Sequence, residues 1–451
     1  MNTNEIQNLV HSQQKYFLTN ETYSLDFRVK ALRTLKKAIQ NHEKDIYAAL
    51  LSDLNKHESE SYMSEVGMVY SELDYMLKHM HSFSKKQRVH TPLAQFHAKS
   101  YKQPCPKGNV LIMSPWNYPF LLTMDPLIDA LAAGNTCLVK PSAYAPATAQ
   151  IIQTIIQEAF PSHYVGVVMG GRKENQTLLD QKFNHIFFTG SQAVGKEVLK
   201  KASEHFTTVT LELGGKSPCI VEKSADVALA AKRIVFGKLL NCGQTCVAPD
   251  YIYCDVSIYD ALLQALKTEI QKQYCHNGKI VNEKHYIRLK QLLKTCELLY
   301  GGECEDSTLQ ITPALVKATQ ESIIMQDEIF GPILPILPYK NIEEVYTFIQ
   351  SHSCPLAFYI FSQNKEIIEQ ATTTIPFGGG CVNDTVIHLA SNQMGFGGFM
   401  ESGMGSYHGK VGFDTFTHYK SIVDKKCWID LPIRYQPYTK TKDQLIRFFM
   451  K

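Results

Sequence analysis

The chain has 451 residues, 44% of them hydrophobic and 20% charged, a composition typical of globular proteins that excludes disordered and fibrous classes. At about 150 residues per domain, this length predicts two or three domains. Lys and Arg number 46 against 43 Asp and Glu, a net charge of +3, which gives no reason to expect a nucleic-acid partner or an anionic membrane surface.

The first hundred residues are expected to be helical. Five apolar residues recur at steps of three, four or seven and so mark one face of a helix: Leu32, Leu35, Ile39, Ile46 and Leu50. Residues 59–80 form a second candidate helix. Both segments are expected to serve in packing.

Short apolar strands alternate with helices after Gly108. The expected strands cover 110–113, 136–139, 164–169 and 185–188. The expected helices cover 119–133, ending at Gly134, and then 147–160, 174–179 and 192–202. This alternation is typical of βαβ units around a parallel sheet.

A second alternating block begins near Leu211, where the sequence predicts a domain boundary. Its expected strands cover 207–213, 218–221 and 251–254, and its expected helices cover 225–239 and 258–273. No stretch reaches the ~18 apolar residues of a membrane span. The twelve cysteines are far below the ~8% of a disulfide-rich secreted chain, and the N-terminus has no secretory leader pattern. We therefore expect a soluble cytoplasmic protein with free thiols and no membrane span.

Two features of the sequence point to chemistry, though neither decides it alone. Gly190 and Gly195 follow a strand and open a helix, where free N–H groups can hold a phosphate, but an ordinary strand-to-helix turn has the same glycines. Cys246 lies in a loop rich in Gly, Asn, Gln and Thr, which favours a reactive thiol. Cys242 lies four residues earlier, but no further ligands at metal spacing accompany the pair, so we set a zinc site aside.

A thiol nucleophile needs a group that resolves its product. Glu212 and Glu328 are the candidates for water activation or cofactor binding, and Glu212, at an apolar strand end, is expected to have a raised pKa. Asn117 offers an amide donor for an oxyanion. Both residues could also have a purely structural role: Glu212 as a solvated charge at a strand end, and Asn117 as a turn residue before Pro119.

Six segments, taken together and in this order, carry a family resemblance. They are SPWNYPF (114–120), FTGSQAVG (188–195), LELGGKSP (211–218), NCGQTCVAP (241–249), EIFGP (328–332), and GFGG (395–398) with SGMG (402–405). From about Leu32 to about Tyr438 the sequence resembles the NAD(P)-dependent aldehyde dehydrogenases, and it looks most like their class 3 branch, which includes fatty aldehyde dehydrogenases.

The resemblance implies an α/β fold with a doubly wound cofactor domain, an α/β catalytic domain and a small β oligomerisation arm. The cofactor domain would comprise 1–83 and 104–210, the catalytic domain 211–395, and the arm 84–103 and 411–430, followed by a tail over 431–451. A homodimer is the class 3 expectation.

The resemblance also assigns roles to residues. Cys246 matches the nucleophile, Glu212 the general base, and Asn117 the oxyanion donor that acts with the N–H of Cys246. Tyr118 and Phe396 match aromatic residues that line the aldehyde tunnel. The positions that match cofactor-binding residues are Lys140, Ser142, Gly190, Ser191, Gly195, Glu328 and Phe330.

The implied activity is the oxidation of an aldehyde to a carboxylic acid with NAD or NADP, through a cysteine thiohemiacetal and thioester. The implied substrate is a medium- or long-chain aliphatic or aromatic aldehyde. The main alternative is a CoA-acylating enzyme, but such enzymes characteristically lack the glutamate found here as Glu212. A cysteine hydrolase would need a histidine partner motif, and a non-catalytic relative should have lost Cys246 or Glu212.

Two positions depart from the family pattern. Ala143 stands where many members carry a glutamate that binds the 2′-hydroxyl of NAD, so the usual discrimination against a 2′-phosphate is missing. Gly395 stands where the family usually has a proline, which bears on the shape of the tunnel loop.

Overall fold

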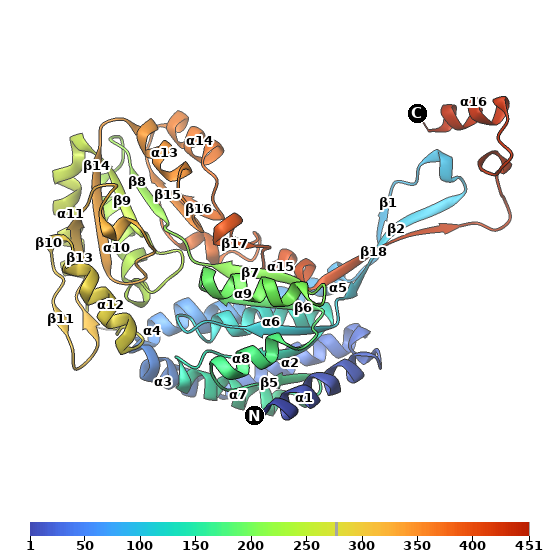
Figure 1. The fold of residues 1–451 in the computed structure, drawn as a ribbon, viewed down its shortest axis with the longest axis horizontal. Coiled ribbons are helices and arrows are strands. Elements are labelled where there is room, and N and C mark those ends of the chain that lie inside the picture. Colours follow the sequence, from blue (N-terminus) through green and yellow to red (C-terminus); the bar gives the residue numbers. More distant parts are fainter. Residues whose placement is uncertain (276–277, 451) are drawn as a thin grey trace.

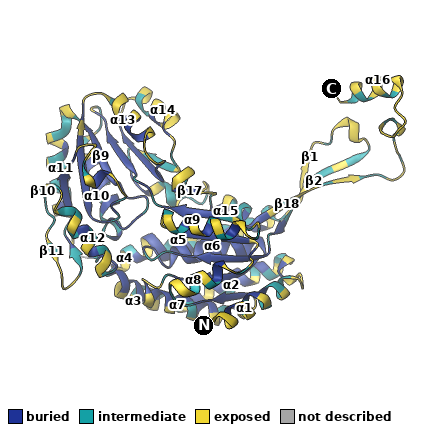
Figure 2. Ribbon diagram, viewed as in Figure 1, coloured by how far each residue is buried: buried dark blue, intermediate teal, exposed yellow. Residues whose placement is uncertain are grey.

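The computed structural model describes residues 1–275 and 278–450. Two α/β lobes lie side by side, and a thin arm projects from one of them (Figure 1). The N-terminus lies on the first lobe, and the C-terminal helix lies at the far end of the arm. Buried residues concentrate on the central sheets of the lobes, whereas the outer helix faces and the arm are largely exposed (Figure 2).

The first lobe is built on a six-stranded sheet in the order β17-β7-β6-β3-β4-β5. Its strands are β3 (Asn109–Met113), β4 (Thr136–Lys140), β5 (Val165–Val167), β6 (His185–Gly190), β7 (Thr208–Leu213) and β17 (Gly403–Met404). All neighbours are parallel except β17, which is antiparallel to β7. The parallel strands expected from the sequence are confirmed.

Helices cover both faces of this sheet. They are α1 (Thr3–Phe17), α2 (Leu25–Asn41), α3 (Glu43–Leu54), α4 (Glu58–Ser61), α5 (Gly67–Phe83), α6 (Leu121–Ala133), α7 (Pro146–Ala159), α8 (Arg172–Leu179), α9 (Gln192–Ser203) and α15 (Gly409–Thr415). Val110 and Ile112 of β3 share one core with α6 and α7, whereas Leu111 and Met113 share another with α1 and α9. This alternation follows from the two-residue period of a strand buried on both faces.

The N-terminal helices differ from the sequence-based expectation in one respect. The apolar face expected from Leu32 to Leu50 belongs to two helices, α2 and α3, because the chain breaks at His42. Residues 59–80 are helical as expected, but a π-helical turn over Tyr62–Val66 joins α4 to α5. Glu65 lies in this turn and is fully buried.

The strand order of the first sheet reverses at β3. The chain runs from β3 outward to β4 and β5, and then returns to β6 on the other side of β3. In open α/β sheets, ligands bind beyond the carboxyl ends of the strands where the order reverses. Here β3 leads into residues 114–120 and β6 leads into Ser191, so two of the motif segments meet at this point.

The second lobe has a seven-stranded sheet in the order β10-β13-β14-β9-β8-β15-β16. The strands are β8 (Pro218–Val221), β9 (Tyr251–Asp255), β10 (Glu297–Tyr300), β13 (Ala314–Lys317), β14 (Ile333–Tyr339), β15 (Ala357–Phe361) and β16 (Gly379–Val382), and a separate pair is β11 (Cys304–Glu305) with β12 (Gln310–Ile311). The helices are α10 (Val227–Leu239), α11 (Tyr259–Gln273), α12 (Glu283–Leu293), α13 (Ile342–Gln350) and α14 (Lys365–Thr374). All sheet neighbours are parallel except β10 and β13.

The change from one sheet to the other occurs after Leu213, two residues beyond the boundary expected at Leu211. β7 pairs with β6 as far as Leu213, so Glu212 is still part of the first sheet. Residues 411–415, expected in the arm, belong to α15, which packs on α5 and α6 of the first lobe.

The arm is a three-stranded antiparallel sheet in the order β1-β2-β18. It comprises β1 (Gln87–Val89), β2 (Ala98–Pro106) and β18 (Thr417–Lys425), and the tail ends in α16 (Lys440–Phe449). β2 and β18 pair over their whole lengths, so the arm joins two segments that are far apart in the sequence. Across residues 1–275 and 278–450, none of the helices combines the length and apolarity that crossing a bilayer needs.

Candidate active site

Cys246 lies in a loop whose backbone conformation is unusual. Asn241, Cys242 and Gly243 have φ angles of 50°, 56° and 70°, all in the left-handed region. At Gly243 a Cβ atom would lie 2.4 Å from the carbonyl oxygen of Gly331, so only glycine fits. The loop therefore needs side chains that hold it in place.

Asn241 and Gln244 supply that support. The Asn241 amide donates to the carbonyl oxygen of Asn117 at 2.7 Å, and its backbone N–H donates to Glu60 at 2.7 Å. Gln244 is fully buried and donates to the carbonyl oxygens of Asn241 and Lys279, each at 3.0 Å. These bonds fix the loop on both sides of the turn that precedes Cys246.

Asn117 comes from the segment after β3 and reaches the same loop. Its side-chain amide is buried and donates to the carbonyl oxygen of Gln244 at 3.0 Å. The hydroxyl groups of Tyr118 and Thr245 form a second link at 2.6 Å. The structure thus brings together the two segments that the sequence singled out as carrying the oxyanion donor and the thiol.

A buried ion pair supports the Asn117 segment from behind. Lys56 Nζ lies 2.6 Å from Glu65, and their side chains are 1% and 0% exposed. The other oxygen of Glu65 accepts the backbone N–H groups of Phe120 and Leu121 at 2.9 and 3.2 Å. Lys56 also lies 4.2 Å from the ring centre of Tyr118 and 3.5 Å from the carbonyl oxygen of Asn117. This pair orders the turn that presents Asn117 and Tyr118.

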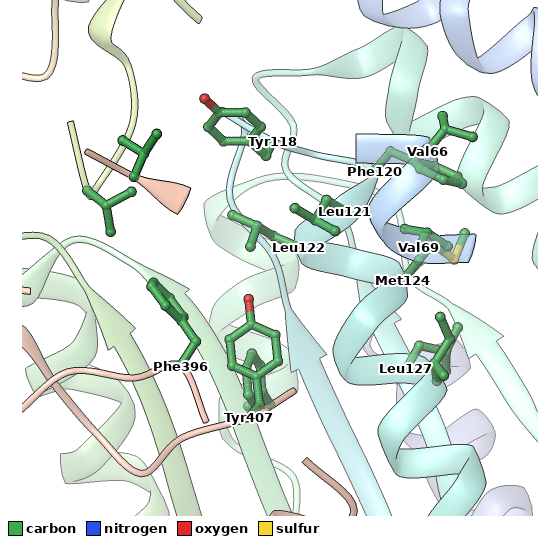
Figure 3. Close-up of a cluster of buried hydrophobic side chains, with 14 of the residues drawn as sticks. Val66, Val69, Tyr118, Phe120, Leu121, Leu122, Met124, Leu127, Phe396 and Tyr407 are labelled. Atoms are coloured by element: carbon green, nitrogen blue, oxygen red, sulfur yellow. The ribbon is translucent and has the colours of Figure 1, made fainter. Parts of the chain in front are cut away.

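The Cys246 side chain lines an apolar cavity of about 160 Å³, which we call the tunnel. Tyr118, Leu122, Phe396 and Tyr407 face one another across this region (Figure 3). Reciprocal backbone hydrogen bonds of 2.9 Å join Phe396 to Tyr407, so the loop after Gly395 still places Phe396 in the wall. The full lining is Met63, Ser64, Met68, Tyr118, Leu121, Leu122, Phe236, Leu240, Thr245, Cys246, Val247, Val386, Ile387, Leu389, Ala390, Phe396, Tyr407 and His408.

Glu212 is a buried carboxylate near the end of β7. It pairs with Thr189 on one side and Gly403 on the other, and it is 3% exposed. Within the described residues, neither of its carboxylate oxygens has a hydrogen-bond partner. Burial therefore raises its pKa well above the usual range.

Burial also determines the pKa of the Cys246 thiol. It raises the pKa of Cys246 to about 12, and the nearby charges of Glu328 and Glu212 add to this rise. The backbone N–H groups of Cys246 and Val247 oppose it. Without a ligand the thiol is therefore protonated at neutral pH, and both acids lie close enough to influence it.

Glu328 and Phe330 come from the second lobe, in the segment between β13 and β14. A Cβ atom at Gly214 would lie 2.0 Å from a carboxylate oxygen of Glu328, so the glycine lets this side chain approach the backbone. Burial and the charge of Asp250 raise the pKa of Glu328 to about 8. Phe330, with a φ of 51°, packs edge-on against Trp116 at a ring separation of 5.3 Å.

The remaining motif residues lie at the ends of β4 and β6. Lys140 is buried, donates to the carbonyl oxygen of Pro141 at 2.6 Å, and has its pKa lowered to about 8 by burial. Ser142 accepts the N–H of Tyr144. Ser191 precedes α9, and no hydrogen bond from the described residues of the helix reaches its side chain, which leaves the N–H groups of the first turn available.

Gly190 and Gly195 allow close packing at this corner. A Cβ atom at Gly195 would lie 2.8 Å from a methyl group of Leu213, so the start of α9 packs directly on β7. As for metals, the described part of the chain has no cluster of three or more His, Cys, Asp or Glu side chains suited to an ion.

The sequence and this geometry match a known family. A family model described as the aldehyde dehydrogenase family matches residues 1–422. The chain belongs to the aldehyde dehydrogenase family.

Individual relatives match over nearly the whole chain. The 4,4'-diaponeurosporen-aldehyde dehydrogenase of Staphylococcus aureus is 43% identical, covering 99% of this chain and 100% of the relative. The "Aldehyde dehydrogenase, dimeric NADP-preferring" of Canis lupus familiaris is 39% identical, covering 96% and 98%. A solved structure described as the substrate-bound state of Staphylococcus aureus AldH has a TM-score of 0.97 at 42% identity and covers 99% of both chains.

The protein is therefore an oxidoreductase that converts aldehydes to carboxylic acids with NAD or NADP. The fold, family and activity predicted from the sequence are confirmed. The CoA-acylating alternative is not favoured by these comparisons.

Sequence reasoning did not identify the residues that support the site. Glu65 lies in a segment that was expected only to pack, and Lys56 lies in the short connection between α3 and α4, which the sequence analysis did not single out. Asn241 was not separated from the rest of its loop. The left-handed turn before Cys246 carries one signal that could have been used, since Asn and Gly, found here at positions 241 and 243, are the residues that most often adopt such backbone.

Proposed function

We propose that Cys246 is the nucleophile of this aldehyde dehydrogenase, that Asn117 and the Cys246 N–H stabilise the oxyanion, and that Glu212 activates water. One observation carries the proposal: Cys246 lines an apolar cavity, the Asn117 amide from the other lobe bonds to the loop that holds Cys246, and the charge of Glu212 acts on the thiol. The unpaired oxygens of Glu212 suit a base that must bind a water molecule.

The chemistry follows from these positions. The Cys246 thiol releases its proton to solvent, and the thiolate adds to the aldehyde carbon. The new oxyanion accepts hydrogen bonds from Asn117 and the Cys246 N–H, each typically contributing about 3 kcal/mol. A bound oxidised nicotinamide would supply the acceptor for the hydride that leaves the carbon, and loss of this hydride converts the Cys246 thiohemiacetal into a thioester. Glu212 then takes a proton from water, the hydroxide adds to the thioester carbon, and the Cys246 sulfur leaves as the acid forms.

The residues just beyond the carboxyl ends of β4 and β6 suit a dinucleotide. Ser191 leaves the first-turn N–H groups of α9 open to a pyrophosphate, and buried Lys140 would bind the adenosine ribose. Ser142 would lie beside Lys140, and Gly190 and Gly195 would allow the phosphates to approach the backbone. Glu328 and Phe330 would position the nicotinamide ribose and ring.

Both NAD and NADP are proposed as cofactors. Ala143 cannot repel a 2′-phosphate, and its side chain is exposed. Glu174, on α8, is the acidic residue whose charge acts on Lys140, but its carboxylate is already bonded to the N–H of Gly171 at 2.7 Å. A similar relative is named as NADP-preferring, which supports the proposal.

The substrate and assembly are proposed from the tunnel and the arm. An apolar tunnel lined by Tyr118 and Phe396 favours medium- or long-chain aliphatic or aromatic aldehydes. β1 and β18 present free strand edges, which suits pairing with a second copy, and one relative is named as dimeric. A homodimer is therefore proposed. The cytoplasmic location expected from the sequence stays a prediction.

Replacing the thiol tests the proposal. Cys246→Ser should abolish aldehyde-dependent reduction of NAD(P) while the fold and cofactor binding persist. Cys242→Ser, in the same loop but lining a different cavity, is the matched control and should stay active. Substantial turnover by Cys246→Ser would show that another group attacks the aldehyde.

A further inference from the structure

A second cavity lies beside the tunnel. It has a volume of about 480 Å³, and we call it the side cavity. It shares the side chains of Met63, Phe236 and Leu240 with the tunnel wall. The rest of its lining is His57, Ser59, Glu60, Leu239, Cys242, Gln273, Tyr274, Cys275, Ile311, Pro313 and Pro332. The side chains of these three shared residues therefore separate the tunnel, which holds Cys246, from the side cavity, which has three times its volume.

The tunnel alone is too small for a long chain. A volume of 160 Å³ is close to that of an engineered apolar cavity of about 150 Å³ that holds one benzene molecule, which has six carbon atoms. An aldehyde with more than about six carbons must therefore extend past the tunnel. The shared wall is the natural exit, because Met63 is 50% exposed and Phe236 is only partly buried.

The side cavity offers a chain both apolar walls and a charged one. Leu239, Ile311 and Pro313 provide apolar contact, and Met63, an unbranched side chain, can move to let a chain pass. Glu60 stands in the wall with one carboxylate oxygen held by the Asn241 N–H at 2.7 Å. A carboxylate that is held in the cavity wall repels an anionic chain end.

We infer that the side cavity is a subsite for the distal end of long unbranched aldehydes, and that Glu60 makes it select neutral over anionic ends. This inference rests on the proposed function, which places the reacting carbonyl at Cys246. The carbon chain of the aldehyde then runs from Cys246 through the tunnel, passes over Met63 and Phe236, and ends in the side cavity.

Filling the side cavity should separate long from short substrates. Leu239→Trp places an indole in it, and Ser59→Trp does so from another element. Leu229→Trp, on the same helix α10 but 38% exposed and outside both cavities, is the control. We expect each cavity variant to lower kcat/KM for dodecanal at least tenfold while kcat/KM for hexanal stays within twofold of wild type. The control should change neither.

Equal losses for both aldehydes, or no loss for either, would overturn the subsite. The proposed function is judged separately, on the wild-type enzyme. If wild type oxidises hexanal with NAD(P), the proposed function holds even when the subsite fails, and if it does not, the proposed function itself is wrong.

The charge of Glu60 is tested with a twelve-carbon aldehyde that carries a terminal carboxylate. Wild type should prefer dodecanal over it by at least tenfold, and Glu60→Gln should narrow that ratio; an unchanged ratio would remove Glu60 from the inference.

Discussion

Removing the cation of the buried Lys56–Glu65 pair should destabilise the protein and slow catalysis together. In Lys56→Met the Glu65 carboxylate stays buried beside the N–H groups of Phe120 and Leu121 but loses its counter-charge at 2.6 Å. Breaking a fully buried pair in this way costs about 3–5 kcal/mol. At about 2–4 °C per kcal/mol for a unit the size of the first lobe, the melting temperature should fall by roughly 6–20 °C.

The catalytic effect follows from the same contacts. Lys56 and Glu65 order the turn that presents Asn117, so the oxyanion donor should lose its position. Complete loss of one such donor lowers kcat by about 10²–10³, and a displaced donor should approach that range. Scanning calorimetry and steady-state kinetics measure the two effects. Lys36→Met, which removes a partly exposed ion pair with Asp74, is the control and should change the melting temperature little.

Two outcomes would refute this reasoning. If Lys56→Met melts like wild type, the pair is not the buried, closely bonded contact described here. If it melts lower but keeps its kcat, the pair stabilises the lobe without positioning Asn117.

Three further predictions concern the cofactor and the core. Ala143→Glu should weaken NADP more than NAD by about 1–3 kcal/mol, measured by titration, whereas a wild type that already rejects NADP a hundredfold (about 2.7 kcal/mol) would contradict the assignment. Because the pKa of Lys140 is about 8, its charge is lost as pH rises through 8, so NADP affinity should fall between pH 7 and 9, and Lys140→Arg should flatten that profile. Burial and the nearby acids Glu72 and Asp125 raise the pKa of Asp129 well above its usual value. The folded state therefore holds the Asp129 proton more tightly than the unfolded state does. The protein loses stability as the pH rises above the pKa that Asp129 has in the unfolded chain. Asp129→Asn should therefore raise the melting temperature more at pH 8 than at pH 5; an equal shift at both would show that Asp129 does not titrate with folding.

The sequence was sufficient where the signal is local. The strands of both sheets are short apolar runs, and the helix over Leu121–Ala133 ends at Gly134 in the left-handed conformation, as a glycine after an apolar helix predicts. The motif segments also indicated, through their family resemblance, that Asn117, Glu212 and Cys246 would meet.

The sequence was insufficient where the signal depends on tertiary structure. Ile39 and Ile46 are seven residues apart, close to two helical turns, so the apolar pattern stays in phase across the break at His42 and cannot reveal it. Lys56 and Glu65 are ordinary surface residue types, and only folding shows that both are buried. The side cavity likewise forms from helix ends and loops that have no common motif.

The account as a whole depends on a thioester at Cys246 that Glu212 resolves. The most direct measurement is rapid mixing of Glu212→Gln with aldehyde and NAD(P), followed by intact-protein and peptide mass spectrometry. We predict a burst of about one reduced cofactor per site, then a stall, with the acyl group on the Cys246 peptide. Loss of the burst, or an acyl group on any other residue, would contradict the account.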